Sequence, residues 1–123
     1  MRQPPLLSIW DPLAALGLLT RLPVRLPDAA ISRGAKAAWA WPLAGLVVAS
    51  LTAVIALLTL KAGLPQSLAA GLALGVQIMV TGGLHEDGLA DTTDGIWGGW
   101  DKARRLEIMR DSRIGAYGVL ALV

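Results

Sequence analysis

The sequence has 123 residues, of which 54% are hydrophobic and 16% are charged, and its mean hydropathy is +0.57. This composition is too apolar for an ordinary soluble domain and is typical of a membrane protein. The chain contains no cysteine, which excludes a disulfide framework, a thiolate nucleophile and a cysteine-ligated metal site. The formal net charge is only +2, so the distribution of charges along the chain is more informative than their sum.

Residues 1–36 are predicted to form an N-terminal cytoplasmic or interfacial segment. No targeting peptide is expected, because the first residues contain no apolar run of signal-peptide form and no small-residue cleavage site follows them. Apolar residues recur at helical spacing from 6 to 20, with an interruption at Asp11-Pro12. This pattern predicts an amphipathic helix, either lying at the membrane surface with Trp10 at headgroup level or packed against other helices.

The segment 21–27 carries two prolines, which exclude a regular helix there. It also carries two arginines, Arg21 and Arg25. These cations either bind an anion or anchor the chain on the cytoplasmic side of a membrane, and composition alone favours anchoring.

Two uncharged segments are long enough to predict membrane spans. Residues 37–61 form the first predicted span, in which no charge occurs before Lys61, and a helix of about 22 residues there measures about 33 Å against a bilayer core of about 30 Å. Residues 66–84 form the predicted return span, in which Gly71 and Gly75 give a small-residue face that permits close helix packing. Lysine and arginine concentrate before the first span and after the second, which places both flanking regions in the cytoplasm.

Residues 85–113 are predicted to form a cytoplasmic metal and phosphate motif. Asp87, Asp91 and Asp94 are spaced at i, i+4 and i+7, so on a helix their carboxylates share one face. Two like charges about 4 Å apart cost on the order of 4 kcal/mol at an effective dielectric near 20, which favours a bound cation. Hard oxygen ligands favour Mg²⁺ or Mn²⁺ held together with substrate phosphates. The alternative is an acidic, solvated loop next to the membrane.

His85 does not complete a zinc-protease motif, because position 89 is Leu89 and the chain has a single histidine. On a continuous helix His85 points away from the aspartate stripe, so a hydrogen-bonded histidine is favoured over a catalytic base on spacing alone. Several glycines of this region, among them Gly95 and Gly99, allow close backbone approach of the kind that a phosphate-handling loop needs.

Residues 101–113 alternate charges at helical spacing, which predicts a salt-bridged helix where Arg104 pairs with Glu107 or Asp111. The functional interpretation is that Arg110 and Arg113, one helical turn apart, hold phosphate groups bidentately beside the metal. Residues 114–123 are uncharged and apolar, as expected for the start of a third membrane helix.

Three strings in the chain resemble the cobalamin synthase family, also called adenosylcobinamide-GDP ribazoletransferase, whose members are integral-membrane enzymes of the last steps of vitamin B12 assembly. The strings are Leu18-Leu19-Thr20-Arg21-Leu22-Pro23-Val24, the long acidic string from Gly82 to Gly95, and Ile108-Met109-Arg110-Asp111-Ser112-Arg113-Ile114-Gly115-Ala116-Tyr117-Gly118. The resemblance covers nearly the whole chain. Members of the family continue through several more membrane helices, so the chain resembles their N-terminal half.

The resemblance implies an all-α integral membrane fold with several transmembrane helices, in a bacterial or archaeal cytoplasmic (inner) membrane. It also implies a Mg²⁺-dependent reaction, with Mn²⁺ as an alternative ion. In that reaction the phosphocobinamide moiety of adenosylcobinamide-GDP passes to a hydroxyl of α-ribazole or its phosphate, and GMP leaves. The implied partners are these two substrates and the lipid bilayer, without nucleic acid, and oligomerisation is left open.

The same resemblance implies roles for individual residues. One of the candidate catalytic residues, His85 or Asp91, accepts the proton of the ribazole hydroxyl. The metal ligands are Glu86, Asp87, Asp91 and Asp94. The substrate-binding residues are Arg21, Arg110, Asp111, Ser112 and Arg113. Trp97 and Trp100 either contact the corrinoid or anchor the chain at the membrane.

Two alternative functions compete with this interpretation. A CDP-alcohol-type membrane phosphotransferase shares the opening Asp91-x-x-Asp94-Gly95, but it requires Ala-Arg where this chain has Gly98-Gly99, and the remaining part of that motif does not follow. A non-catalytic membrane or transport subunit would line a pore with its acids. Pore acids are expected within a span, whereas these cluster at the end of one.

Overall fold

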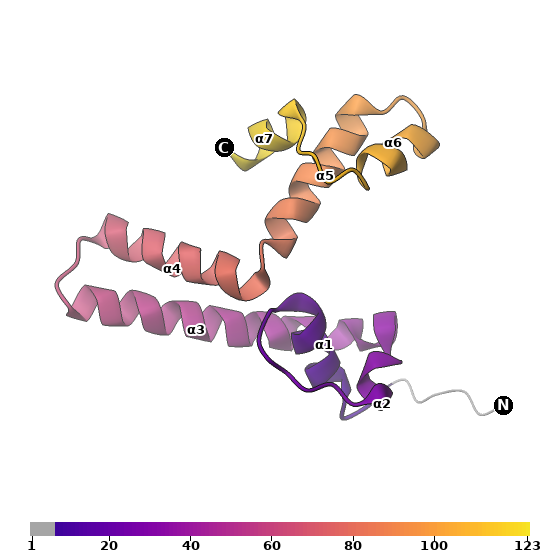
Figure 1. Cartoon of the computed structure of the whole chain (residues 1–123). Helices are drawn as coiled ribbons and strands as arrows, with labels where there is room; N and C mark the ends of the chain where they lie inside the picture. Colours follow the sequence, from indigo (N-terminus) through magenta and orange to yellow (C-terminus); the bar gives the residue numbers. More distant parts are fainter. Residues whose placement is uncertain (1–6) are drawn as a thin grey trace. The chain divides into compact units, whose positions relative to one another are not determined.

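The computed structural model describes residues 7–123, and over that range it contains seven α-helices, one 3₁₀-helix and no strand (Figure 1). The all-α prediction is therefore confirmed for the described residues. The chain divides into two compact units, the first ending at Gly82 and the second running from Gly83 to Val123. The elements of the first unit are α1 (Asp11–Leu19), α2 (Asp28–Ile31), η1 (Gly34–Ala40), α3 (Trp41–Lys61) and α4 (Gln66–Thr81); those of the second are α5 (Leu84–Gly98), α6 (Lys102–Ile108) and α7 (Ala116–Leu122).

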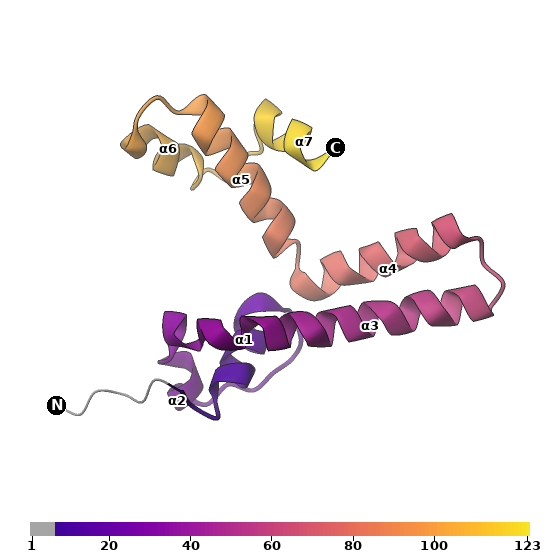
Figure 2. The ribbon, with the colours of Figure 1, turned by 180° about the vertical axis from the view of Figure 1, so that it is seen from behind.

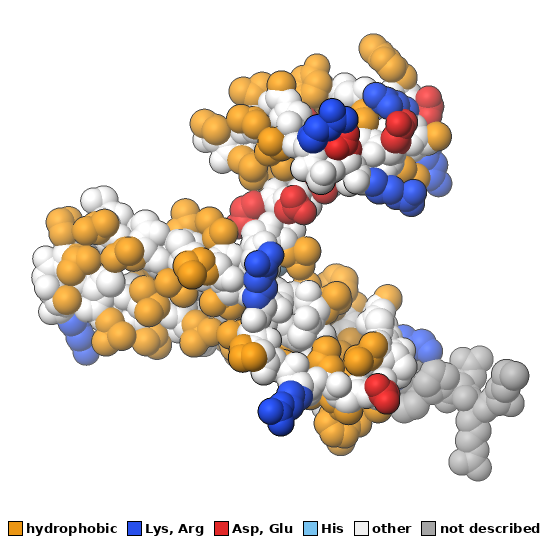
Figure 3. Space-filling model, in the orientation of Figure 1, with side chains coloured by type: hydrophobic (Ala, Val, Ile, Leu, Met, Phe, Trp, Pro, Cys, Tyr) orange, Lys and Arg blue, Asp and Glu red, His pale blue; other side chains and the backbone are white. Residues whose placement is uncertain are grey.

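The first predicted span corresponds to one long apolar helix. η1 and α3 together make a helical stretch from Gly34 to Lys61 whose mean hydropathy reaches 2.5, the one described stretch that meets the criterion for a membrane span by itself. Its apolar side chains lie largely on the surface, and hydrophobic atoms cover much of the face of α3 and α4 in Figure 3. The helix begins before the predicted boundary at residue 37, because Gly34 starts a 3₁₀ turn that leads directly into α3.

The second predicted span is shorter than expected. α4 ends at Thr81 rather than at residue 84, because Gly82 and Gly83 adopt left-handed φ values of 70° and 73°, which stop a right-handed helix. A helix of 16 residues measures about 24 Å, less than the bilayer core of about 30 Å. α4 meets the criterion for a span only when it is joined to α5 across this break.

α3 and α4 lie side by side in both ribbon views (Figures 1 and 2). Ala69 and Ala73 are buried positions of α4, and small side chains there let the two helix backbones approach closely. Gly71 and Gly75 do not take part, since nothing lies within 4 Å of a Cβ built on either residue. The small-residue face predicted from their spacing is therefore not used for packing within the described residues.

α1 packs inside the first unit. It begins at Asp11 with a proline in its first turn, so Asp11-Pro12 is the helix start and not an interruption of a longer helix. This corrects the predicted range of 6–20 for residues 7–10, while residue 6 lies outside the described residues. Its Ala15 packs with Ala40 and Ala44 at the start of the long helix. Of the two predicted placements, the structure supports packing against other helices. Residues 21–27 form no helix, as the prolines predicted.

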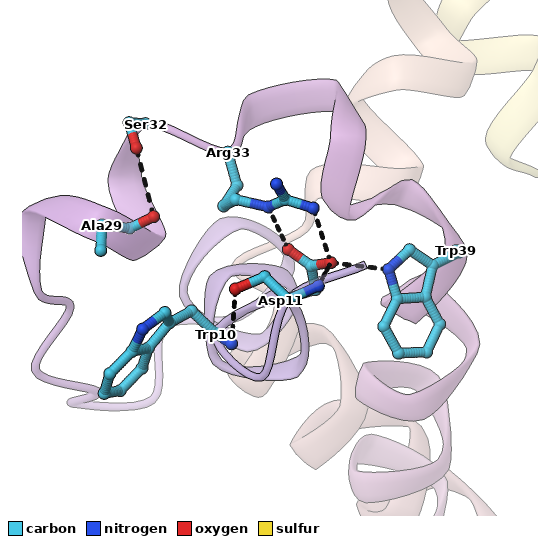
Figure 4. Close-up of polar contacts among 7 residues, drawn as sticks. Trp10, Asp11, Ala29, Ser32, Arg33 and Trp39 are labelled. Atoms are coloured by element: carbon cyan, nitrogen blue, oxygen red, sulfur yellow. Dashed lines mark hydrogen bonds and ion pairs between the residues drawn. The ribbon is translucent and has the colours of Figure 1, made fainter. Parts of the chain in front are cut away.

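A buried ion pair fixes α1 to the entry of the long helix (Figure 4). Arg33 donates from Nε to Asp11 Oδ1 at 2.5 Å and from Nη2 to Oδ2 at 2.9 Å, and Trp39 Nε1 donates to Oδ2 at 2.7 Å. Asp11 is completely buried and Arg33 is 7% exposed. The hydrogen bonds from Arg33 lower the pKa of Asp11 from 3.8 to about 2 despite its burial. Sequence reasoning treated these residues separately and missed the cluster.

Candidate functional site

α5 carries all four predicted metal ligands on one continuous helix, which confirms the helical interpretation of the acidic string. Glu86 and Asp87 lie in its first turn, where carboxylates interact favourably with the positive end of the helix dipole. Burial increases along the aspartate stripe, because Asp87 is exposed, Asp91 is half-buried and Asp94 is only 7% exposed. His85 is exposed. The three aspartates therefore lie on one face of α5 but differ in solvent exposure.

Asp94 contacts the start of α7 with both carboxylate oxygens. The backbone N–H of Gly115 donates to Oδ2 at 2.7 Å, and the N–H of Gly118 donates to Oδ1 at 2.8 Å. Gly115 is the N-cap residue of α7 and provides no side-chain cap of its own. Asp94 therefore satisfies two of the N–H groups that a helix start leaves without an intrahelical partner.

The carboxylates of α5 do not form a complete metal-ligand cluster within the described residues. No group of three or more metal-ligating side chains converges on one point among residues 7–123. Glu86 Oε2 is buried without a hydrogen-bond partner, which leaves an acceptor that a cation would satisfy. Mg²⁺ in phosphoryl-transfer sites is held by one or two carboxylates together with substrate phosphates and water. The residues present fit an ion of that kind.

Asp111 and Arg113 form an ion pair between α6 and α7. Arg113 Nη2 donates to Asp111 Oδ2 at 2.6 Å, and Arg113 Nε and its backbone N–H each donate to Oδ1 at 3.1 Å. These hydrogen bonds lower the pKa of Asp111 and raise that of Arg113. The Arg113 side chain is 87% exposed, so solvent screens the pair and it adds little to stability.

The predicted helix over residues 101–113 ends early, and this corrects the geometry assigned to the arginines. α6 stops at Ile108, so Arg110 and Arg113 lie in the connection to α7 and not one helical turn apart. Asp111 accepts the N–H of Arg113 two residues on, a local turn that competes with helix. Arg104 pairs with Glu107 at 2.8 Å, the first of the two predicted partners.

Two pockets in the second unit are lined by three of the five predicted substrate-binding residues, namely Arg110, Asp111 and Arg113. One of about 340 Å³ is lined by residues of α5, α6, α7 and the connection between α6 and α7, including Asp94 and Arg113. The other, of about 480 Å³, is lined by α6 residues and by Arg110. Glu107 and Asp111 line both. Ser112 is exposed in the same connection, whereas Arg21 belongs to the first unit, where its side chain lies against Gly82.

Gly95 and Gly99 allow close packing within the second unit. A Cβ on Gly95 would overlap the Met109 side chain, and one on Gly99 would overlap Arg105, whose Nε donates to the Gly99 carbonyl at 2.9 Å. The spacing of four residues between these glycines is the signal that could have shown a packing face for α6. Trp97 is 70% exposed and stands 6.3 Å from the ring of Tyr117, while Trp100 is 97% exposed.

Residues 11–123 match the cobalamin-5-phosphate synthase family. The curated relatives are named adenosylcobinamide-GDP ribazoletransferase. The relative from Bradyrhizobium diazoefficiens is 50% identical over 94% of this chain, and that from Xanthobacter autotrophicus is 49% identical over 92%. A relative from Shewanella baltica is 45% identical over 90% of the chain. These matches cover 45%, 44% and 42% of the relatives, so the chain spans less than half of their length. No solved structure matches the chain.

Proposed function

The chain belongs to the cobalamin-5-phosphate synthase family, and we propose that it is the N-terminal half of an enzyme that joins adenosylcobinamide-GDP to α-ribazole or its phosphate. The observation that carries this proposal is the match over residues 11–123, which includes the acidic helix α5 and the Asp111–Arg113 connection. The relatives are named adenosylcobinamide-GDP ribazoletransferase, and this name is the basis for proposing adenosylcobinamide-GDP and ribazole as the two substrates.

The proposed reaction is a displacement at phosphorus. A hydroxyl oxygen of ribazole attacks the phosphorus attached to cobinamide, and the bond from that phosphorus to the bridging pyrophosphate oxygen breaks. GMP leaves with the bridging oxygen, and the hydroxyl proton passes to a base. His85, which is exposed, and Asp91, which is half-buried on the same helix, are the two candidate bases.

Mg²⁺, or Mn²⁺ in its place, would neutralise charge on the pyrophosphate and on the leaving GMP. We assign its protein ligands to Asp87 and Asp91, one turn apart on α5, with Glu86 and its unpartnered Oε2 as the third candidate. One or two carboxylates are sufficient, because phosphate oxygens and water complete the shell of this ion.

Arg113 would bind phosphate by exchanging partners. Its guanidinium already holds both carboxylate oxygens of Asp111, from Nε to Oδ1 and from Nη2 to Oδ2, and a phosphate presents the same geometry to these donors. The exposed position of Arg113 leaves it free to rotate toward a ligand in the 340 Å³ pocket. Arg110, which lines the second pocket, and Arg21 in the first unit are the further candidate anion-binding residues.

Arg113→Ala is expected to reduce kcat/KM for adenosylcobinamide-GDP by about 100-fold, since a charge-assisted bidentate contact to phosphate is lost. Arg113→Lys should restore little of the lost kcat/KM, because an ammonium group lacks the planar pair of donors that a guanidinium presents to phosphate. The matched control is Lys102→Ala, which removes an exposed cation at the start of α6. Steady-state kinetics of GMP release measure all three. Equal effects in Arg113→Ala and Lys102→Ala would contradict a specific phosphate contact.

We propose that the protein crosses a bacterial or archaeal cytoplasmic membrane several times, with the N-terminus and the acidic motif in the cytoplasm. The apolar stretch Gly34–Lys61 and the distribution of cations support this topology. An oligomer is compatible with it, and no nucleic acid is expected as a partner.

Single cysteines test this topology without background labelling from residues 1–123, because these residues contain no cysteine. In intact cells, a membrane-impermeant maleimide is expected to label Lys61→Cys at the end of α3 but not Lys102→Cys in α6. Permeabilised cells should give labelling at both positions. Labelling of both positions in intact cells would contradict the proposed crossing by residues 66–84.

The activity itself is tested with the chain extended to the length of its relatives. GMP release is followed in membranes with adenosylcobinamide-GDP, α-ribazole and Mg²⁺, each omitted in turn. We expect release that requires all three. Release without the ribazole acceptor would indicate a pyrophosphatase instead of a transferase, and release without corrinoid would exclude the proposed substrate.

A further inference from the structure

We infer that Asp94, on α5, is a positioning residue and not a metal ligand. Its carboxylate fixes the connection between α6 and α7, which carries Asp111 and Arg113. This inference rests on the proposed function, which it deepens by separating the aspartate stripe into two roles. Asp87 and Asp91 face the metal and substrate, and Asp94 holds the phosphate-binding connection in place.

The contacts of Asp94 support this role. The residue is buried, and each of its oxygens accepts one backbone N–H, at 2.7 Å from Gly115 and 2.8 Å from Gly118. Carboxylate hydrogen bonds to backbone donors are charge-assisted and hold a segment firmly. Such a carboxylate has fewer lone pairs left for a cation than Asp91, which is half-buried and accepts no hydrogen bond from another helix among residues 7–123. 

The glycines opposite Asp94 fit the same contact. A Cβ on Gly115 would overlap the Asp94 carboxyl group. A Cβ on Gly118 would lie 2.5 Å from Asp94 Oδ2 and 3.1 Å from Ala90 Cβ, so both α5 residues press against this position. Gly118 is itself buried. The Gly115-Ala-Tyr-Gly118 string is thus shaped to receive Asp94 and Ala90, which are one turn apart on α5.

The contact controls the position of Arg113. Gly115 follows Arg113 by two residues, so fixing the Gly115 N–H limits where the guanidinium can reach. Asp94 and Arg113 also line the same 340 Å³ pocket. Loss of the carboxylate frees the connection and leaves two N–H groups without their acceptor, which misplaces the phosphate-binding group without removing any ligand of the metal.

The test compares Asp94→Asn, Gly118→Ala and Asp91→Asn in the chain extended to the length of its relatives. Gly71→Ala in α4 is the matched glycine control, because a Cβ there also meets open space and the residue lies outside the acidic motif. We expect Asp94→Asn and Gly118→Ala to raise KM for adenosylcobinamide-GDP by about 10-fold to 100-fold, with KM for α-ribazole unchanged. Gly71→Ala should leave both constants within about twofold of the wild type.

Two readouts do not depend on activity and so separate a failure of this inference from a failure of the proposed function. Hydrogen exchange of the amides at residues 115–118 should be faster in Asp94→Asn than in the wild type, and unchanged in Asp91→Asn. Mn²⁺ binding, measured by electron paramagnetic resonance, should be unchanged in Asp94→Asn and weakened in Asp91→Asn. Unchanged exchange in Asp94→Asn overturns the inference, and so does weaker Mn²⁺ binding in that variant. If the wild type releases no GMP, the exchange result still decides whether Asp94 holds this segment.

Discussion

Asp91→Asn is expected to reduce GMP release by about 10³-fold or more while the protein still inserts into the membrane. The substitution keeps the shape of the side chain and removes the charge that the proposed metal requires, and a metal ion at a phosphoryl-transfer centre supplies several kcal/mol of charge stabilisation. Asp91 is half-buried on α5 and lies between exposed Asp87 and buried Asp94. The measurement is the initial rate of GMP release in membranes at a Mg²⁺ concentration that saturates the wild type.

The matched control for this variant is Asp28→Asn, which removes an exposed carboxylate from α2 in the first unit. It changes the net charge by the same amount and should leave the rate unchanged. An active Asp91→Asn enzyme would exclude Asp91 as a metal ligand and as the base together. Recovery of the Asp91→Asn rate at higher Mg²⁺ would separate these roles, because a missing base is not restored by more metal.

The sequence was sufficient to predict features that depend on neighbouring residues along the chain. The long apolar helix ending at Lys61 follows from an uninterrupted run without charge, and the aspartate stripe follows from spacing along one helix. The break after α4 could also have been predicted from the sequence, because Gly82 and Gly83 are consecutive and glycine commonly ends a helix.

Features that depend on contacts between distant residues were missed. Asp11 and Arg33 are 22 residues apart, and Asp94 lies 21 residues from Gly115. Spacing along one helix groups Asp94 with the other aspartates, but its partners are N–H groups of a different helix. The end of α6 at Ile108 was also missed, because charge alternation continues through Arg113 while a local turn at Asp111 stops the helix.

Asp11→Asn is expected to lower the melting temperature of the protein in detergent by about 10 °C at neutral pH, because it removes the buried carboxylate charge that pairs with the Arg33 guanidinium. Breaking a buried pair by removing one partner costs more than the pair contributes, since the remaining charge stays desolvated. Circular dichroism at a helical wavelength follows the transition. Trp39→Phe is the matched control, since it removes only one donor to Asp11, and its effect should be clearly smaller.

The pH dependence of the melting temperature, compared between the wild type and Asp11→Asn, provides a second check. The pKa of Asp11 is lowered to about 2 by its hydrogen bonds from Arg33, so the folded state binds the proton less readily than the unfolded state. The contribution of Asp11 to stability is therefore fully present above its ordinary pKa of 3.8 and is lost as the pH falls toward about 2. The wild type should lose melting temperature over this window more steeply than Asp11→Asn. Equal pH slopes in the two proteins would contradict the role given to Asp11. A double variant Asp11→Leu/Arg33→Met that melts no higher than Asp11→Asn would contradict it too, because this variant removes both buried charges.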